Sequence, residues 1–177
     1  MPALPSPRLT NGLIFLLCVV TLGIVYYLDG VLGLEPCPLC MTQRVFVVGC
    51  GAMCLLALLH GPGQLGRRVY AVLAGLFAVG GGAVAGRHVW LQHLPEDQVP
   101  ACGPGLEYMM ENFPFGEVIE LILMGDGNCA EVVWTFAGLS IPEQALLLFV
   151  FLVAANLWQL LRRDATASAG AGEEPRD

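Results

Sequence analysis

Four long apolar stretches constrain this chain more than any other feature of its sequence. Crossing about 30 Å of hydrocarbon takes roughly 20 helical residues, and the segments 12–28, 41–59, 69–91 and 143–161 come close to or exceed that length. Backbone groups inside a membrane must be paired within their own segment, so each stretch is expected to be a helix. The 177 residues are 56% hydrophobic and 13% charged, with a mean hydropathy of +0.68. We therefore predict one all-α membrane domain, a four-transmembrane-helix bundle.

Basic residues indicate which ends of these helices face the cytoplasm. The arginines that flank the expected spans are Arg8, Arg67, Arg68, Arg162 and Arg163. They fall in the amino-terminal tail 1–11, in the loop between the second and third spans, and in the carboxyl-terminal tail 162–177. Because loops rich in arginine stay on the cytoplasmic side, both tails are predicted to be cytoplasmic. The first span is expected to be retained, because its apolar run is long and no small-residue cleavage site follows it.

The other side of the membrane receives the acidic part of the chain. Segment 92–142 contains acidic residues and no lysine or arginine, and the formal net charge of the chain is −7 at pH 7. Nucleic acid is not expected as a partner, because its phosphates are negative too. The apolar residues after Pro114 are too few to span a membrane and too many to stay solvated. They predict a short amphipathic helix on the membrane surface, with a segment packed on the bundle as the alternative.

The inferred topology divides the seven cysteines into two groups. Cys18, Cys50 and Cys54 fall within the first two spans, where free cysteines behave as small hydrophobic residues. The cysteines on the outer side are Cys37, Cys40, Cys102 and Cys129. We expect the first group to be packing residues, and any sulfur chemistry to belong to the second.

Cys37 and Cys40 form a CxxC motif at the boundary between lipid and water. A disulfide that closes so short a loop adds little to the stability of a fold. The CxxC spacing is instead known for lowering a thiol pKa and for disulfide exchange. Pro36 and Pro38 keep the approach extended, so the second helix is expected to begin close to Cys40. The Cys40 thiolate would then face unpaired amides and the positive end of the helix dipole.

Arg44 follows Cys40 by four residues and so shares its helix face one turn deeper. An arginine at that depth is costly unless it has a partner. We expect its guanidinium to support an anion, either the Cys40 thiolate or a reduced acceptor oxygen. The alternative is an arginine that only snorkels to the membrane interface.

Cys102 and Cys129 pair across a long stretch of the outer loop. A disulfide between them that only stabilises the loop would contribute on the order of 3–4 kcal/mol in the chain-entropy model. Four cysteines can also bind zinc, but only Cys37 and Cys40 have ligand spacing, and no second CxxC or paired histidine follows. No metal site is therefore predicted.

Several motifs follow one another along the chain. They are Pro-Cys-Pro-Leu-Cys at 36–40 with Arg44, Gly-Arg-His-Val-Trp-Leu-Gln-His at 86–93, Cys102, Gly-Asn-Cys-Ala-Glu at 127–131, and Trp134. Together they resemble the disulfide bond formation protein B (DsbB) family, from the first span through the fourth. The resemblance implies a quinone reductase of the bacterial inner membrane that reoxidises DsbA, the soluble thiol oxidant of the periplasm.

The resemblance also implies a role for each outer cysteine. Cys102 would form the mixed disulfide with DsbA, and Cys129 would be its partner in the disulfide of the mobile loop. Cys37 would exchange with Cys129 and link the two loops transiently. Cys40 would then be the thiolate that contacts or adds to ubiquinone or menaquinone.

Two residues are implied to bind the quinone. Arg44 would bind and polarise it, and His93 matches a stretch near the family's quinone site. A polar role at the membrane interface explains His93, Gln92, Arg87 and His88 nearly as well. Two other functions stay open: a quinone-linked redox protein similar to vitamin K epoxide reductase, and a non-catalytic membrane scaffold whose outer loops are held by disulfides.

Overall fold

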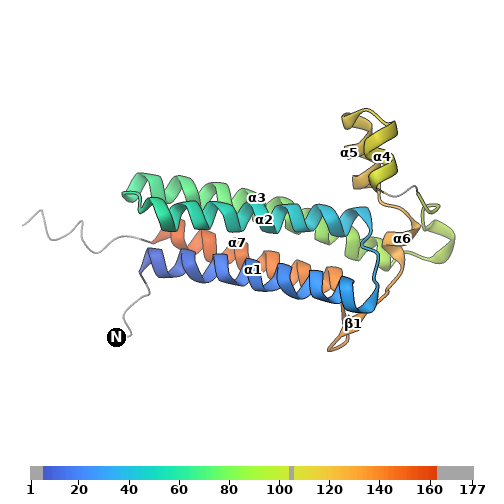
Figure 1. The fold of residues 1–177 in the computed structure, drawn as a ribbon, viewed down its shortest axis with the longest axis horizontal. Helices are drawn as coiled ribbons and strands as arrows, with labels where there is room; N and C mark the ends of the chain where they lie inside the picture. The colour runs from blue at the N-terminus through green and yellow to red at the C-terminus, as the bar shows by residue number, and fades with distance from the viewer. Residues whose placement is uncertain (1–5, 104–105, 163–177) are drawn as a thin grey trace, which may run out of the picture.

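Four long helices make up most of the molecule. The computed structural model describes residues 6–103 and 106–162. The long helices are α1 (Pro7–Leu32), α2 (Pro38–His60), α3 (Gln64–Gln92) and α7 (Ile141–Leu161). They run side by side as a bundle (Figure 1), and each is long and apolar enough to cross a membrane. The predicted all-α membrane fold with four spans is thereby confirmed.

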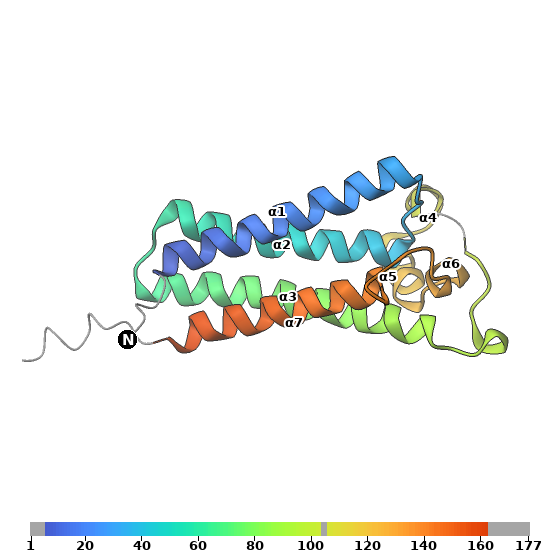
Figure 2. The same cartoon turned by 90° about the horizontal axis from the view of Figure 1, so that it is seen from below.

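The two ends of the bundle differ in composition. Arg8, Arg67 and Arg162 lie where α1 begins, α3 begins and α7 ends, and we call this the arginine end. Arg163 and the tail after it lie outside the described residues. At the opposite end α1 finishes, α2 starts and the short elements between α3 and α7 gather (Figures 1 and 2). We call this the loop end.

Proline positions make two spans begin earlier than the apolar patterns suggest. α1 begins at Pro7 rather than at Gly12, because proline fits the first turn of a helix and the Ser6 hydroxyl accepts the Leu9 N–H at 3.2 Å. Part of the tail expected over residues 1–11 is therefore helical. α2 likewise begins at Pro38.

The start of α7 follows the capping pattern that the sequence predicts. The Ser140 backbone N–H donates to the Glu143 carboxylate at 2.7 Å, so an otherwise unpaired donor is satisfied. A small hairpin leads into this helix, with β1 (Thr135–Phe136) antiparallel to β2 (Leu139–Ser140). Both turn residues between the strands have left-handed φ values, as a tight type I′ turn requires.

The centre of the bundle is an apolar core that includes three thiols. Cys18, Cys50 and Cys54 are each at most 2% exposed and belong to the same cluster as Phe149 and Leu152. Their burial among apolar side chains confirms the prediction that they are packing residues. By contrast, many large apolar side chains on the outward faces of the long helices are exposed, as a lipid environment requires.

Four short helical elements connect α3 to α7. They are η1 (Glu96–Gln98), α4 (Leu106–Asn112), α5 (Phe115–Met124) and α6 (Gly127–Ala130). α4 and α5 project sideways from the loop end (Figure 1). α5 is the short helix predicted after Pro114: Phe115 and Ile119 are exposed, while Ile122 packs against the buried Leu39 and Leu91. The helix therefore combines an outward apolar surface with an anchor on the bundle.

Gly81 provides a test of the contact between α3 and α7. A Cβ at this position would overlap the ring of Phe149, which is 0% exposed and cannot swing away. Gly81→Ala is expected to lower the melting temperature of the detergent-solubilised protein, because overpacking a core costs about 1–3 kcal/mol. Gly86→Ala on the same helix is the matched control, since its Cβ would meet nothing within 4 Å. Equal melting temperatures for the two variants would contradict this close approach.

Candidate active site at the loop end

The CxxC motif forms the first turn of α2. Cys37 is the N-cap residue, and its Sγ accepts the Cys40 backbone N–H at 3.5 Å. The sequence led us to expect the Cys40 sulfur to face the free amides of this turn. The structure gives that position to Cys37, because Pro38 occupies the first helical position and starts the helix one turn earlier.

His88 of α3 lies between the two sulfurs of the motif. Its Nε2 is 3.8 Å from Cys37 Sγ and its Nδ1 is 4.0 Å from Cys40 Sγ. The Gln43 side-chain amide is 3.1 Å from the same Nδ1 and holds the ring in place. The histidine is only 3% exposed, so its ring is a polar group buried directly beside the dithiol.

The role of His88 was missed at the sequence level, although a signal was present. The buried residues of α3 near this end are Val84, Ala85, His88 and Leu91, spaced by one helical turn. His88 therefore lies on the core face of the helix. His93, which the resemblance implied as a quinone ligand, does not belong to this buried face of α3.

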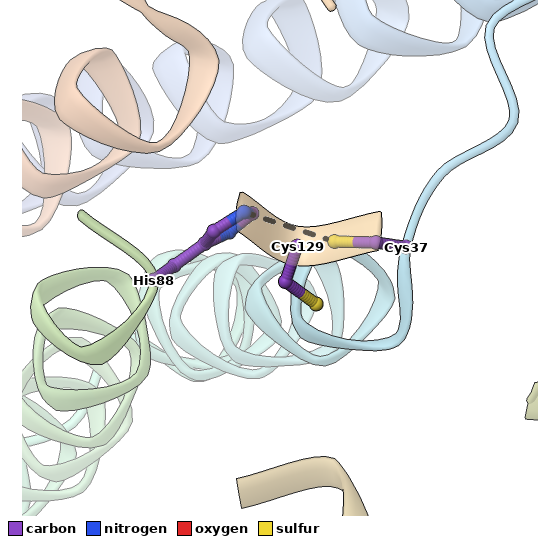
Figure 3. Close-up of side chains that lie close together, drawn as sticks. All are labelled: Cys37, His88 and Cys129. Atoms are coloured by element: carbon purple, nitrogen blue, oxygen red, sulfur yellow. Dashed lines mark hydrogen bonds between the residues drawn. The ribbon is translucent and has the colours of Figure 1, made fainter. Parts of the chain in front are cut away.

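Cys129 lies beside Cys37 and His88 although it is far from both in the sequence. It is 0% exposed in α6, and its backbone N–H donates to the Asp126 carboxylate at 3.2 Å. Its sulfur, the Cys37 sulfur and a ring nitrogen of His88 lie within 4.8 Å of one another (Figure 3). Two cysteines that lie far apart in sequence are thus neighbours.

The surroundings of Cys129 keep its thiol protonated. The contact with Cys37 Sγ and, secondly, desolvation by burial raise the pKa of the Cys129 thiol above its usual value. Both effects oppose a negative charge on this sulfur. In this arrangement Cys129 is a protected thiol rather than a reactive thiolate.

Cys102 differs from the other outer cysteines by its exposure. The Gly127 backbone N–H donates to the Ala101 carbonyl at 3.3 Å, and a Cβ at Gly127 would lie 3.0 Å from Cys102 Sγ. The Cys102 sulfur is therefore close to the start of α6, the helix that carries Cys129. No two cysteines are joined by a disulfide in this structure.

Arg44 has a carboxylate partner that the sequence did not reveal. Its Nη1 lies 2.6 Å from Asp29 Oδ2, near the end of α1, and its guanidinium stacks over the Tyr26 ring at 5.0 Å from the centroid. The anion that Arg44 contacts in the structure is Asp29, and not the Cys40 thiolate or the acceptor oxygen that the sequence led us to expect. A cation at this depth is stabilised by such a pair.

A cavity of about 350 Å³ opens beside these residues. Its lining is mostly apolar and comes from α1, α2, α3, α7 and the segment 128–134. Figure 2 shows α1 separating from α2 toward the loop end. The polar lining groups include Cys40, Gln43, Arg44 and His88. The cavity is thus apolar over most of its surface, with polar side chains and the dithiol at one end.

The structure does not bring His93 to this cavity. The residue is exposed at the end of α3, where its Nδ1 pairs with the Val89 carbonyl at 2.8 Å. Gln92 lines the cavity, whereas Arg87 lies outside it and donates to the Met124 carbonyl at 3.0 Å. Within segment 86–93, His88 is the residue whose ring nitrogens contact the sulfurs of the CxxC motif.

Comparison with known proteins gives consistent matches over nearly the whole chain. A family model described as Disulfide bond formation protein DsbB matches residues 7–159. Disulfide bond formation protein B of Stutzerimonas stutzeri is 52% identical over 161 residues, which cover 91% of this chain and 99% of the relative. The protein of the same name from Saccharophagus degradans is 53% identical over 160 residues, covering 90% and 96%. Disulfide bond formation protein B 1 of Pseudomonas aeruginosa is 52% identical over 160 residues, covering 90% and 98%.

Removing the Cys37 sulfur should make Cys129 easier to deprotonate. The contact with Cys37 is the largest cause of the raised pKa of Cys129, and only a thiolate reacts with iodoacetamide. In reduced Cys37→Ala protein, the pH profile of Cys129 alkylation is expected to shift to lower pH relative to the wild type. Peptide mass spectrometry measures each site separately, with exposed Cys102 as the internal control. An unshifted Cys129 profile would argue against the contact.

Proposed function

The chain belongs to the DsbB family of disulfide bond formation proteins, and from this premise we propose that it is a quinone-dependent thiol oxidase of the bacterial inner membrane. It reoxidises a DsbA-like dithiol oxidant in the periplasm and passes two electrons to a membrane quinone. The observation that carries the proposal is the meeting of Cys37 with Cys129 beside an apolar cavity that reaches Arg44. Such a site joins a sulfur of the outer loop to a sulfur that lines the apolar cavity.

The orientation that this function requires agrees with the distribution of charge. The arginine end faces the cytoplasm, because arginines concentrate there. The loop end, with its acidic loop and four cysteines, faces the periplasm, where disulfides persist. The exposed apolar side chains of α5, such as Phe115 and Ile119, then rest at the membrane surface.

The relay begins at Cys102, the exposed sulfur. In the oxidised enzyme Cys102 and Cys129 share a disulfide, and a thiolate of the DsbA-like partner attacks Cys102. The Cys102–Cys129 bond breaks, a mixed disulfide forms, and Cys129 leaves with the electron pair. The partner's second thiolate then attacks its own mixed-disulfide sulfur, so the partner leaves oxidised and Cys102 becomes a thiol.

The second half of the relay uses the proximity of Cys129 to Cys37. The freed Cys129 sulfur attacks Cys37 of the Cys37–Cys40 disulfide, forming a Cys37–Cys129 bond and releasing Cys40 as a thiolate. Cys102 next attacks Cys129, which restores the loop disulfide and releases Cys37. The two electrons then reside on Cys37 and Cys40 at the edge of the cavity.

The residues around the cavity fit a quinone. An apolar chamber of about 350 Å³ is within the range of small-molecule sites, and its opening between α1 and α7 suits a lipid-soluble tail. DsbA is a strong oxidant at about −120 mV, so a bound ubiquinone or menaquinone supplies the more oxidising acceptor, taking up two electrons and two protons. Arg44 and Gln43 offer N–H donors to an acceptor oxygen next to Cys40.

We assign the histidine role at this site to His88, in place of the quinone-site role that the resemblance implied for His93. Its ring lies 4.0 Å from Cys40 Sγ and 3.8 Å from Cys37 Sγ, so it can hold a proton next to whichever sulfur carries charge. The contact with Gln43 fixes the orientation of the ring. His88 is therefore the residue that moves or retains a proton at the dithiol.

Replacing Cys40 tests whether this chain is an enzyme. Cys40→Ser is expected to abolish quinone reduction driven by a reduced DsbA-like partner, measured as loss of quinone absorbance in detergent. Cys54→Ser is the matched control, because Cys54 is a buried packing residue of the same helix, and it should keep its activity. A scaffold held by disulfides would show no quinone reduction in either protein or in the wild type.

The Arg44–Asp29 pair tests the assignment of the quinone pocket. Arg44→His is expected to raise the apparent KM for quinone, because a charge-assisted donor to the acceptor oxygen is lost. Asp29→Asn should raise the KM as well, since the guanidinium loses the carboxylate that orients it at 2.6 Å. A change of about tenfold corresponds to about 1.4 kcal/mol. Unchanged KM values in both variants would refute the pocket.

A further inference from the structure

Three potential metal ligands converge at the loop end from three separate elements. Cys37 is the N-cap of α2, His88 belongs to α3 and Cys129 to α6. Their ligand atoms lie within 4.8 Å of one another (Figure 3), with 3.8 Å between Cys37 Sγ and His88 Nε2. His88 and Cys129 are buried and Cys37 is partly buried, so few water molecules compete for these atoms.

These spacings are close to those around a tetrahedral d10 cation. Zinc binds thiolate at about 2.3 Å and imidazole at about 2.0 Å, which puts sulfur and nitrogen about 3.5 Å apart and two sulfurs about 3.8 Å apart. The observed Cys37–His88 separation of 3.8 Å is within a few tenths of an ångström of that value. Contraction of the other pairs by at most about 1.3 Å would complete the arrangement. Thiolate and imidazole are also the donors that zinc, cadmium and copper(I) prefer.

Neighbouring groups hold the ligands in the required orientation. The Gln43 side-chain amide contacts His88 Nδ1 at 3.1 Å, which leaves Nε2 directed toward Cys37 and available as a ligand. In a ring that binds metal through Nε2, Nδ1 carries the proton, and the Gln43 amide accepts it once turned so that its oxygen faces the ring. The Asp126 carboxylate accepts the Cys129 backbone N–H at 3.2 Å and fixes the turn that carries this sulfur.

We propose that Cys37, His88 and Cys129 form a binding site for a thiophilic d10 cation such as Zn²⁺, open only in the reduced protein. Binding converts two thiols to thiolates and releases two protons, and no electrons are transferred. A water molecule or a small anion from the cavity takes the fourth position. Cys40 and Cys102 are not ligands, because neither belongs to the cluster of atoms within 4.8 Å.

The site has a regulatory consequence that rests on the proposed function. A cation held by Cys37 and Cys129 blocks the disulfide that the relay must form between them. It therefore traps the fully reduced enzyme, in which a second partner molecule has reduced the Cys102–Cys129 disulfide before quinone has reoxidised Cys37 and Cys40. Zn²⁺ is expected to inhibit the oxidase when quinone is scarce, and a chelator should restore activity.

Metal binding is measured first without any redox partner. Full-length protein in detergent is reduced with a phosphine, loaded with Zn²⁺, freed of excess metal by gel filtration and analysed for bound zinc. We expect one equivalent in the reduced wild type and none after oxidation to the disulfide form. Cd²⁺ in place of Zn²⁺ should add a thiolate-to-metal charge-transfer absorption. Zinc bound equally by reduced and oxidised protein would overturn the proposal.

Single substitutions then identify the ligands. Cys37→Ser, Cys129→Ser and His88→Gln should each weaken Zn²⁺ binding at least tenfold, whereas Cys40→Ser and Cys102→Ser, the matched thiol controls, should keep one equivalent. Loss of binding in Cys40→Ser with retention in Cys129→Ser would assign the metal to the CxxC motif and refute the site. Because quinone and DsbA are absent, failure here leaves the proposed oxidase untouched. Inactivity of the oxidase with normal zinc binding would refute only the proposed function.

Discussion

The packing of α6 against α3 and against Leu39 in the first turn of α2 is the contact on which the rest of the site depends. Cys129 is fully buried there in a cluster with Leu39 and Leu91. Burial of these apolar side chains stabilises the contact without any covalent bond. A loop that would otherwise be free to move is held against the bundle, and its sulfur is brought within reach of Cys37. Electron transfer by disulfide exchange needs this direct contact between sulfurs.

The same end of the bundle contains charges and polar groups that would be costly in lipid if they were unpaired. Arg44 is neutralised by Asp29, and His88 is satisfied by Gln43 and the sulfurs. Arg44 and His88 therefore each have a partner inside the protein, as a low-dielectric setting demands. This pairing allows an apolar cavity to be lined by a few polar groups without destabilising the helices.

Sequence reasoning identified the local features and missed the contacts between remote segments. Apolar length predicted the four spans, the Ser140 pattern predicted the start of α7, and spacing singled out the CxxC motif. The position of Cys37 as the N-cap of α2 follows from Pro38 in the first turn, a local effect that could have been anticipated. Asp29 was missed because its role depends on how α1 packs against α2, which no local pattern encodes. For His88 the helical spacing indicated burial on the core face of α3, but not its contact with the sulfurs.

The arrangement of the seven thiols also explains how one chain can combine structural and reactive cysteines. Cys50 follows Cys40 on α2 by ten residues, which corresponds to about 15 Å along a helix. Disulfide exchange cannot cross such a gap, because it requires the attacking sulfur to touch the disulfide. Cys18 and Cys54 lie in the same buried core as Cys50. The inner thiols are thus isolated by distance and by packing, and oxidation is confined to the sulfurs that meet at the loop end.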